Sequence, residues 1–339
     1  MTALSCKALA LGGTLALVSA CGRGADVTLY VALDQEHSSR LVQQCEADTG
    51  LSIRSRYDTE TNKTVGLVSA IVEEAGRPRC DVFWNNELAH TVRLLQKGLT
   101  TPYASPSGRD IPAQWKDPVG HWHGFAARAR VLIVNKGLLP DPAEWPRSTW
   151  DLVNPKWKGR CGVARPLTGT TLTHFTALRF ALGEAEFARL VDGLFTNEVV
   201  LLQGNGATMR QVAEGKLAWA FTDTDDYHVA LQKGHPVGVV FPDQGEGQIG
   251  TMLIPNSVTL VKGGPHPEAA RKLVDWILRE ETEALLAAAK SAQIPLRTSV
   301  PGPSERSILR SGEFRAMRWE PAVVAENLER MVGEFHKRF

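Results

Sequence analysis

Strand-like apolar runs alternate with helix-like runs in the first hundred residues, and this alternation limits the fold more than any other feature. The apolar run Val27–Leu33 is predicted as a buried strand, and Glu36–Gly50 as a helix that ends at a glycine. The pattern continues with a strand, a helix and a strand at Leu51–Tyr57, Thr61–Gly76 and Cys80–Trp84. This order predicts a parallel sheet with right-handed crossovers.

A second set of the same kind occupies the middle of the chain. Four runs are predicted as strands: Cys161–Pro166, Val199–Gln203, Leu217–Phe221 and Pro236–Phe241. Three runs are predicted as helices: Thr171–Gly183, Glu184–Phe195 and Ala207–Lys216. The chain is therefore predicted to be an α/β protein with two lobes, each a mostly parallel sheet flanked by helices.

Two longer strand-like runs, Phe125–Asn135 and Gly250–Gly263, stand apart from these sets. The second is followed by a helix with an early proline, predicted over His266–Ala289 because its apolar residues recur at helical spacing. If the two runs cross between the lobes as a hinge, residues 27–126 and 261–339 form lobe 1. Residues 127–260 then form lobe 2.

The composition describes a globular protein without a polyanionic partner. A chain of 339 residues with 43% hydrophobic and 22% charged residues can bury the cores of about two domains. Thirty-eight basic residues against 37 acidic residues give a net charge of +1. The sequence therefore lacks the basic excess typical of nucleic-acid-binding proteins.

The N-terminus is predicted to be an export signal. Lys7 precedes the apolar run Ala8–Ala20, which is too short to span a bilayer and is typical of a secretory signal. The stretch Val18–Cys21 resembles a bacterial lipobox, so residues 1–20 are predicted as a lipoprotein signal peptide with lipid on Cys21. Cleavage of an ordinary signal peptide near Ala20 or Ala25 is the alternative. Both readings place the mature protein outside the cytoplasm, in the periplasm.

Three further cysteines, Cys45, Cys80 and Cys161, lack the C-x-x-C spacing of a zinc site. Cys45 lies late in the first predicted helix and Cys80 just before the third predicted strand. The two could therefore meet at one end of an α/β layer and pair in an oxidising compartment. Buried free thiols are the other interpretation, and the sequence leaves both open.

The ligand site is predicted at the loops that follow the strands. In open α/β sheets, ligands bind beyond the carboxyl ends of strands, where loops and helix N-termini converge. In the first lobe these loops are residues 34–37, 57–60 and 84–87. In the second lobe they are residues 168–171, Asn205 and residues 222–227. The stretch Phe221–His228, FTDTDDYH, is the densest of them, with three carboxylates, two hydroxyls, a tyrosine and a histidine.

Each of these loops also has a structural interpretation. The Thr168–Thr171 loop could hold an oxyanion at a helix N-terminus, or it could simply cap that helix. Trp84, beside two amides and Glu87, could form a ligand wall or pack between the lobes. Asp225 or Asp226 could cap the helix that follows. Asp223 would then need another explanation.

Several long segments resemble one known family. They are VTLYVALDQEHSSRLVQQCEADTGLSI, YDTETNKTVGLVSAI, RCDVFWNNELAHTVRLLQKGLTTPY, NPKWKGRCGVARPLTGTT, AEGKLAWAFTDTDDYHVALQKGHPVGVVFPDQ and IPNSVTLVKGGPHPEAARKLVDWIL. Together they resemble the two-lobed, type II extracellular solute-binding proteins of ABC importers, closest to the ferric-iron-binding branch. The resemblance implies a monomeric, non-enzymatic protein that closes its lobes on a small solute and delivers it to a membrane permease.

The resemblance also implies a ligand set. Ferric members present two adjacent tyrosines at the position of Asp226 and Tyr227, often with a histidine from the first loop, and this chain keeps one tyrosine. We expect Tyr227, Asp226, Glu60 and His37 as metal ligands, with Fe³⁺ as cargo beside a synergistic anion and without an obligatory cofactor. The wider predicted site comprises His37, Glu60, Trp84, Asn85, Glu87, Thr168, Gly169, Thr170, Thr171, Asp223, Asp225, Asp226 and Tyr227.

Other functions are compatible with the same residues. The acidic side chains could pair with an amine or polyamine covered by Trp84. Arg128 and Arg130 would instead favour an anionic solute, or an anion beside a metal. A secreted hydrolase using Asp223, Asp225 and Glu87 is the more distant alternative. The sequence has no G-x-S-x-G elbow, H-E-x-x-H helix, Walker loop or G-x-G-x-x-G fingerprint at a strand end.

Overall fold

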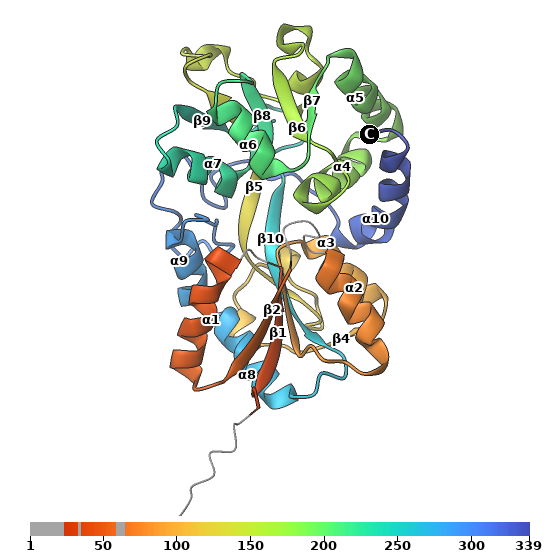
Figure 1. The fold of residues 1–339 in the computed structure, drawn as a ribbon, viewed down its shortest axis with the longest axis vertical. Helices are drawn as coiled ribbons and strands as arrows, with labels where there is room; N and C mark the ends of the chain where they lie inside the picture. The colour runs from red at the N-terminus through yellow and green to blue at the C-terminus, as the bar shows by residue number, and fades with distance from the viewer. Residues whose placement is uncertain (1–23, 33–34, 59–64) are drawn as a thin grey trace, which may run out of the picture.

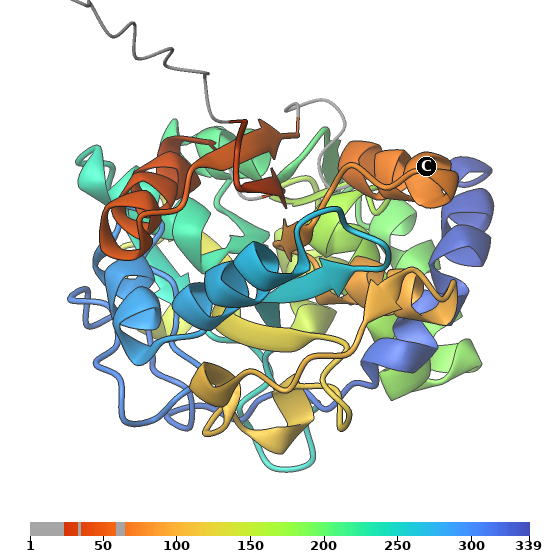
Figure 2. The same cartoon turned by 90° about the horizontal axis from the view of Figure 1, so that it is seen from below.

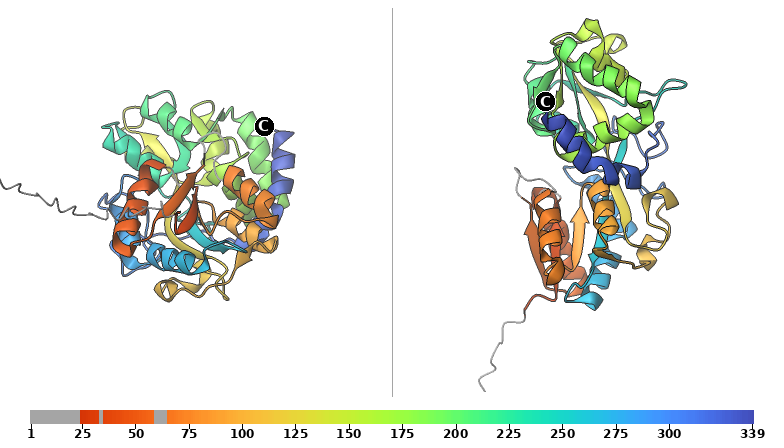
Figure 3. Two further views of the ribbon diagram at one scale, coloured as in Figure 1. Left: turned by 60° about the horizontal axis from the view of Figure 1, so that its bottom comes forward. Right: turned by 90° about the vertical axis from the view of Figure 1, so that its right-hand side faces the viewer.

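The computed structural model describes residues 24–32, 35–58 and 65–339, which fold into two lobes stacked along the long axis of the molecule (Figure 1). Two extended strands run through the waist between the lobes, as the side view in Figure 3 shows. The predicted signal peptide and Cys21 lie outside the described residues. Within the described residues, no helix has both the length and the apolarity needed to cross a bilayer.

Lobe 1 is built on the predicted strand-helix alternation. Its first strands are β1 (Val27–Val31), β2 (Ile53–Tyr57) and β3 (Val82–Asn85), with helices α1 (Gln35–Thr49) and α2 (Val65–Glu73) between them. β1 lies between β2 and β3 and is parallel to both, so Val31 is the partner of Tyr57 on one side and Trp84 on the other. Seen from below, the helices flank this sheet (Figure 2).

Lobe 2 repeats the parallel arrangement. β6 (Cys161–Ala164) lies between β7 (Val200–Leu202) and β8 (Trp219–Asp223) and is parallel to both. The helices of this lobe are α4 (Gly169–Leu182), α5 (Glu184–Thr196), α6 (Asn205–Ala213) and α7 (Thr224–Gln232). The strand β9 (Val237–Val240) runs antiparallel to β5. The predicted two-lobed α/β fold is therefore confirmed.

The two lobes share the long strand β5 (His123–Asn135), which is buried along its whole length. Its first half pairs antiparallel with β10 (Leu253–Val261) of the lobe 1 sheet, up to Ala129 opposite Leu253. From Arg130, opposite Asp223, it pairs antiparallel with β8 of lobe 2. β5 thus changes sheets within two residues, and a site at this crossing touches both lobes.

The remaining elements complete the packing. They are α3 (Leu88–Gln96), β4 (Thr100–Thr101), α10 (Pro321–His336) and short 3-10 helices at residues 74–76, 106–108, 113–115, 142–144, 149–153 and 155–157. The C-terminal helix α10 contacts both α3 of lobe 1 and α4 of lobe 2 (Figures 1 and 3). The proposed division of the chain at residues 126 and 260 stays a prediction.

One predicted helix is two. The pattern over His266–Ala289 forms α8 (Pro267–Ile277) and α9 (Glu280–Ala288), because Arg279 takes an extended backbone conformation, φ −67° and ψ 152°. Side chains satisfy carbonyl groups at the end of α8: Thr282 donates to the carbonyl of Trp276, and Arg297 donates to that of Leu278, both at 2.8 Å. The helical periodicity of the sequence gives no sign of these distant donors.

Cys45, Cys80 and Cys161 are all buried free thiols, so the pairing of Cys45 with Cys80 does not form. The two side chains belong to separate hydrophobic clusters, on the α1 side and the α2 side of lobe 1. Burial raises the pKa of Cys45 to about 11 and that of Cys161 to about 12. The thiols therefore serve the core as small apolar groups.

Candidate functional site

The carboxylate of Asp223 is the centre of a buried polar network at the carboxyl end of β8. One oxygen accepts a hydrogen bond from Arg130 Nη1 at 2.6 Å. The other accepts from Thr170 Oγ1 at 2.8 Å and from Asn205 Nδ2 at 2.9 Å. Although burial opposes ionisation, the nearby guanidinium groups of Arg130 and Arg128 and these hydrogen bonds lower the pKa of Asp223. This side chain therefore organises the site.

The predicted loop Thr168–Thr171 forms the N-terminal end of α4 and joins this network. Gly169 has φ +60°, a left-handed conformation that favours glycine. Arg130 donates to Thr170 Oγ1 at 3.4 Å and to Thr171 Oγ1 at 3.3 Å. The N-cap residue Thr168 makes no side-chain hydrogen bond to its helix. Simple capping by Thr168 therefore does not account for the loop.

Asp225 and Asp226 are half-buried and lie in the first turn of α7. Together with Asp223 they bring three carboxylates to one place, with one oxygen from each lying within 4.8 Å of the others. Thr222 Oγ1 donates to Asp226 Oδ2 at 2.8 Å. Asp225 Oδ1 accepts from the backbone N–H of Asp226 at 3.0 Å. Asp225 thus makes a local helix-start contact and also belongs to a group that can hold a cation.

Lobe 1 contributes Glu87 to the same place. Its side chain is 1% exposed, and its Oε2 accepts from Thr173 Oγ1 of α4 at 2.9 Å. Its Oε1 lies 3.7 Å from Arg128 Nη2. Desolvation outweighs these contacts and raises the pKa of Glu87 to about 7. Glu87 and Asp223 are therefore both buried, but their pKa values are shifted in opposite directions because Asp223 is much better paired.

We call Glu87, Arg128, Arg130, Asp223, Asp225 and Asp226 the interlobe charge cluster. It contains four carboxyl groups and two guanidinium groups, so it carries a net charge of −2 when every group is ionised. The arginines were candidates for binding an anionic solute. In the structure Arg130 pairs with Asp223, and Arg128 lies between Glu87 and Asp225. The cluster therefore favours a cationic guest.

Two predicted site residues in lobe 1 are structural. β3 continues through Asn85, which places Trp84 inside the strand, where its indole ring is buried 5.3 Å from the ring of Phe125 in an edge arrangement. Trp84 is thus not exposed as a ligand wall. The amide of Asn85 is equally buried, and it donates to the carbonyl of Glu87 at 2.6 Å and to Thr91 Oγ1 at 3.0 Å.

The hydroxyl of Tyr227 bonds to a residue outside the group of three carboxylates. Its side chain is 2% exposed, and its hydroxyl forms a hydrogen bond with Ser307 Oγ at 2.9 Å. Burial raises the pKa of this hydroxyl. The physical reason is helical rotation, because each residue of α7 is turned about 100° from the one before it. His37 and Glu60, the other predicted metal ligands, lie outside the described residues as far as their side chains are concerned.

Thr173 and Ser307 contact site residues and were not predicted, whereas Thr222 lies in the predicted loop 222–227. Thr173 lies one turn after Thr170 on α4, so its helical spacing is a signal that the sequence carries. The contact from Ser307 to Tyr227 spans 80 residues and has no local signal.

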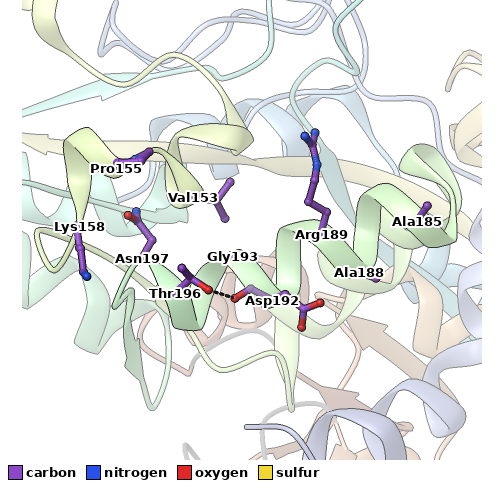
Figure 4. A pocket seen from close by; sticks show the side chains of 10 residues that line it. All are labelled: Val153, Pro155, Lys158, Ala185, Ala188, Arg189, Asp192, Gly193, Thr196 and Asn197. Carbon is purple, nitrogen blue, oxygen red and sulfur yellow. Dashed lines mark hydrogen bonds between the residues drawn. The ribbon is translucent and has the colours of Figure 1, made fainter.

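A separate groove of about 730 Å³ lies between α5 and residues 153–158 (Figure 4). Its polar lining includes Lys158, Arg189 and Asn197. Thr196 bonds within its own helix, from Oγ1 to the carbonyl of Asp192 at 3.2 Å. The groove contains no residue of the interlobe charge cluster, so it is not part of the candidate site.

Residues 89–333 match the family described as bacterial extracellular solute-binding protein. The chain belongs to this family. This family assignment confirms the resemblance that the sequence segments show to extracellular solute-binding proteins. The family is one of binding proteins, and its members act outside the cytoplasm.

Two relatives of this chain carry names that refer to different solutes. Iron uptake protein A1 of Synechocystis is 28% identical over 319 residues, covering 88% of this chain and 86% of the relative. A putative 2-aminoethylphosphonate-binding periplasmic protein of Salmonella typhi is 24% identical over 340 residues, covering 97% of each. Among solved structures, iron-bound HitA from Pseudomonas aeruginosa has a TM-score of 0.81 at 23% identity, covering 91% of this chain and 98% of HitA.

Proposed function

We propose that this protein is the substrate-binding component of an ABC import system, and that its cargo is ferric iron bound together with an anion. The family assignment supports the binding role, and the iron-related names of several relatives support the cargo. The observation that carries the proposal is the group formed by Asp223, Asp225 and Asp226. Fe³⁺ prefers hard, anionic oxygen ligands, and the net negative cluster supplies them.

The two half-buried aspartates are the lobe 2 ligands in this proposal. Asp223 already accepts three hydrogen bonds, so a metal bound to it would compete with Arg130, Thr170 and Asn205 for its oxygens. Asp225 and Asp226 are less buried than Asp223 and lie at the positive end of the α7 dipole. His37 and Glu60 from lobe 1 remain the proposed partners across the interface.

The N-terminal turn of α4 is the proposed place for the accompanying anion. Backbone N–H groups at a helix N-terminus favour negative charge, and they are the donors for the anion because the hydroxyls of Thr170 and Thr171 already donate to Asp223 and Asn205. An anion there would offset part of the triple charge of the metal. A guest that combines a hard cation with an anion therefore suits both halves of the site.

Capture would proceed by movement of the lobes about β5 and β10. A cargo that bridges groups of both lobes favours whichever arrangement it binds more tightly, and it can shift the equilibrium only by that difference in affinity. The two crossing strands are the natural hinge, because β5 changes its pairing partner between Ala129 and Arg130. The loaded form would then dock on the permease.

We also infer where the protein works and in what oligomeric state. The protein works as a monomer in the periplasm, held to a membrane by lipid on Cys21, and performs no catalysis.

A cationic organic solute, such as an amine, is the second candidate cargo. The charge of the cluster favours it, as does the bonding of Tyr227 to Ser307, which leaves this tyrosine less suited to binding a metal.

Elemental analysis and mass spectrometry of the purified protein would separate these cargoes. We expect iron in protein prepared with ferric citrate, together with a rise in melting temperature that depends on ligand concentration. Putrescine and 2-aminoethylphosphonate serve as comparison ligands. A melting temperature raised by putrescine and unaffected by ferric citrate would overturn iron as the cargo and support the amine.

A further inference from the structure

Two arginines of β5 are held in different ways, although their spacing places both side chains on one face of the strand. Arg130 lies 2.6 Å from an oxygen of Asp223, a full charge-assisted hydrogen bond. Arg128 Nη2 lies 3.7 Å from Glu87 Oε1, and its Nη1 lies 3.9 Å from Asp225 Oδ2. Arg128 is thus within ion-pair range of two carboxylates, at longer distances than the one that separates Arg130 from Asp223.

These two carboxylates belong to different lobes. Glu87 directly precedes α3 of lobe 1, whereas Asp225 lies in the first turn of α7 in lobe 2. Arg128 itself stands just before the point where β5 leaves the lobe 1 sheet. Its Nη2 also donates to the backbone carbonyl of Asn86 at 2.8 Å, which keeps the guanidinium on the lobe 1 side of the crossing.

A cation bound at Asp225 would weaken the ion pair between Asp225 and Arg128. Like charges repel more strongly in a partly buried site than in water, so the guest and the guanidinium compete for the same carboxylate. Glu87 offers a second carboxylate within a short displacement, since a closing of roughly 1 Å would bring Arg128 to charge-assisted hydrogen-bond distance. Glu87 is in turn held against α4 by Thr173.

We propose that Arg128 is a movable counter-ion that couples the two lobes: a cationic guest on Asp225 displaces its guanidinium toward Glu87, which favours the ionised carboxylate and so strengthens the hydrogen bond that Glu87 of lobe 1 accepts from Thr173 of lobe 2. Arg128 is a positioning residue in this scheme and does not bind the guest. The inference rests on the proposed function only in requiring that the guest is cationic. Ferric iron and an organic amine both meet that requirement.

A double-mutant cycle tests the coupling. Ferric citrate binding is measured for the wild type, Glu87→Gln, Arg128→Met and the double variant, with terbium(III) as a second hard cation and putrescine as an amine. We expect Glu87→Gln to weaken cation binding about tenfold when Arg128 is present and less than twofold beside Arg128→Met. Arg128→Lys, which keeps the charge, restores sensitivity to Glu87→Gln. Arg77→Met, at an exposed arginine, is the matched control and leaves binding unchanged.

A second measurement distinguishes coupling between the lobes from a purely structural role of Arg128. X-ray scattering of the same variants reports the reduction in radius of gyration on loading, which we expect to be smaller in Glu87→Gln than in wild type. Circular dichroism shows which variants fold, and Arg128→Gln replaces Arg128→Met if the latter does not. Equal effects of Glu87→Gln in both backgrounds would overturn the coupling.

The probes separate the two proposals. Binding of terbium or putrescine without ferric citrate would reject iron as the cargo and still leave the cycle measurable. If none of the three cations binds, the site is not cationic in its preference, and the counter-ion role of Arg128 is rejected with it.

Discussion

Thr173 of α4 donates a hydrogen bond from its hydroxyl to the carboxylate of Glu87 at 2.9 Å, and both side chains are buried. This contact joins residues 86 positions apart and fastens the loop before α3 in lobe 1 to a helix of lobe 2. It also places an ionisable group in a site with little solvent. The stability of the interface therefore depends on the charge of Glu87.

The raised pKa of Glu87 predicts a loss of stability as the pH increases. The folded pKa of about 7 exceeds the ordinary value of 4.5, so the folded protein binds more protons than the unfolded chain between these values. The contribution of Glu87 is therefore fully present below pH 4.5 and is lost as the pH rises through 7, by at most roughly 3 kcal/mol.

Denaturant unfolding from pH 4.5 to 8 in wild type and Glu87→Gln measures this effect. Buried histidines act in the opposite direction, since burial lowers the pKa of His90 to about 4. The difference between the two proteins isolates Glu87, because both retain these histidines. As the pH rises, the free energy of unfolding of the wild type should fall relative to that of Glu87→Gln. A difference between the two proteins that stays constant with pH would show that Glu87 does not titrate in this range.

Removing the Thr173 hydroxyl should destabilise the protein. Thr173→Val keeps the shape of the side chain and deprives a buried carboxylate of a donor, which we expect to lower the free energy of unfolding by about 1–3 kcal/mol at pH 8. Thr196→Val is the control, because that exposed hydroxyl bonds only within its own helix. Equal stability of Thr173→Val and wild type would mean that the carboxyl group finds another donor.

Cargo binding should depend on Asp226 far more than on its neighbour in sequence. Asp226→Asn removes a charged ligand and should weaken ferric citrate binding at least tenfold. Tyr227→Phe should change it less than twofold, because the Tyr227 hydroxyl bonds to Ser307. Isothermal titration calorimetry compares both with Glu246→Gln, an exposed control. A large effect of Tyr227→Phe would show that this side chain turns toward the cargo on loading.

The hinge strand contains a strained residue. Ala126 has φ +36°, which is unfavourable for a residue with a side chain, and its N–H donates to Glu283 Oε1 at 2.7 Å. Ala126→Gly should therefore raise the free energy of unfolding by up to about 1 kcal/mol, as relief of strain exceeds the added chain entropy. Ala127→Gly, at the adjacent buried position, should lower it. Thermal unfolding of both variants checks the contrast, and equal destabilisation would argue against strain at residue 126.

The sequence predicts the fold well because the fold follows from local patterns. The apolar runs place the ends of β1, β6 and β8 within two residues of their observed positions. The break between α8 and α9 was missed, since the groups that satisfy the freed carbonyls include Arg297, far from the break in sequence.

The candidate site is harder to predict because it depends on side-chain direction. The sequence correctly brings the strand-end loops of lobe 2 together, so Thr170 and Asp223 meet as a consequence of the parallel topology. It cannot tell that Trp84 lies in a core, since an extension of β3 by one residue decides that. Nor can it show that Arg128 lies between carboxylates of two lobes, because that arrangement forms only at the crossing of β5.

The three thiols enclosed in the described part of the molecule have a practical consequence. Burial and high pKa values leave Cys45, Cys80 and Cys161 almost without thiolate at neutral pH, so they should resist alkylating dyes. A cysteine introduced on the surface of the mature chain could then be labelled selectively with a fluorophore. Placed near the waist, such a dye would turn the protein into an optical reporter of its own ligand.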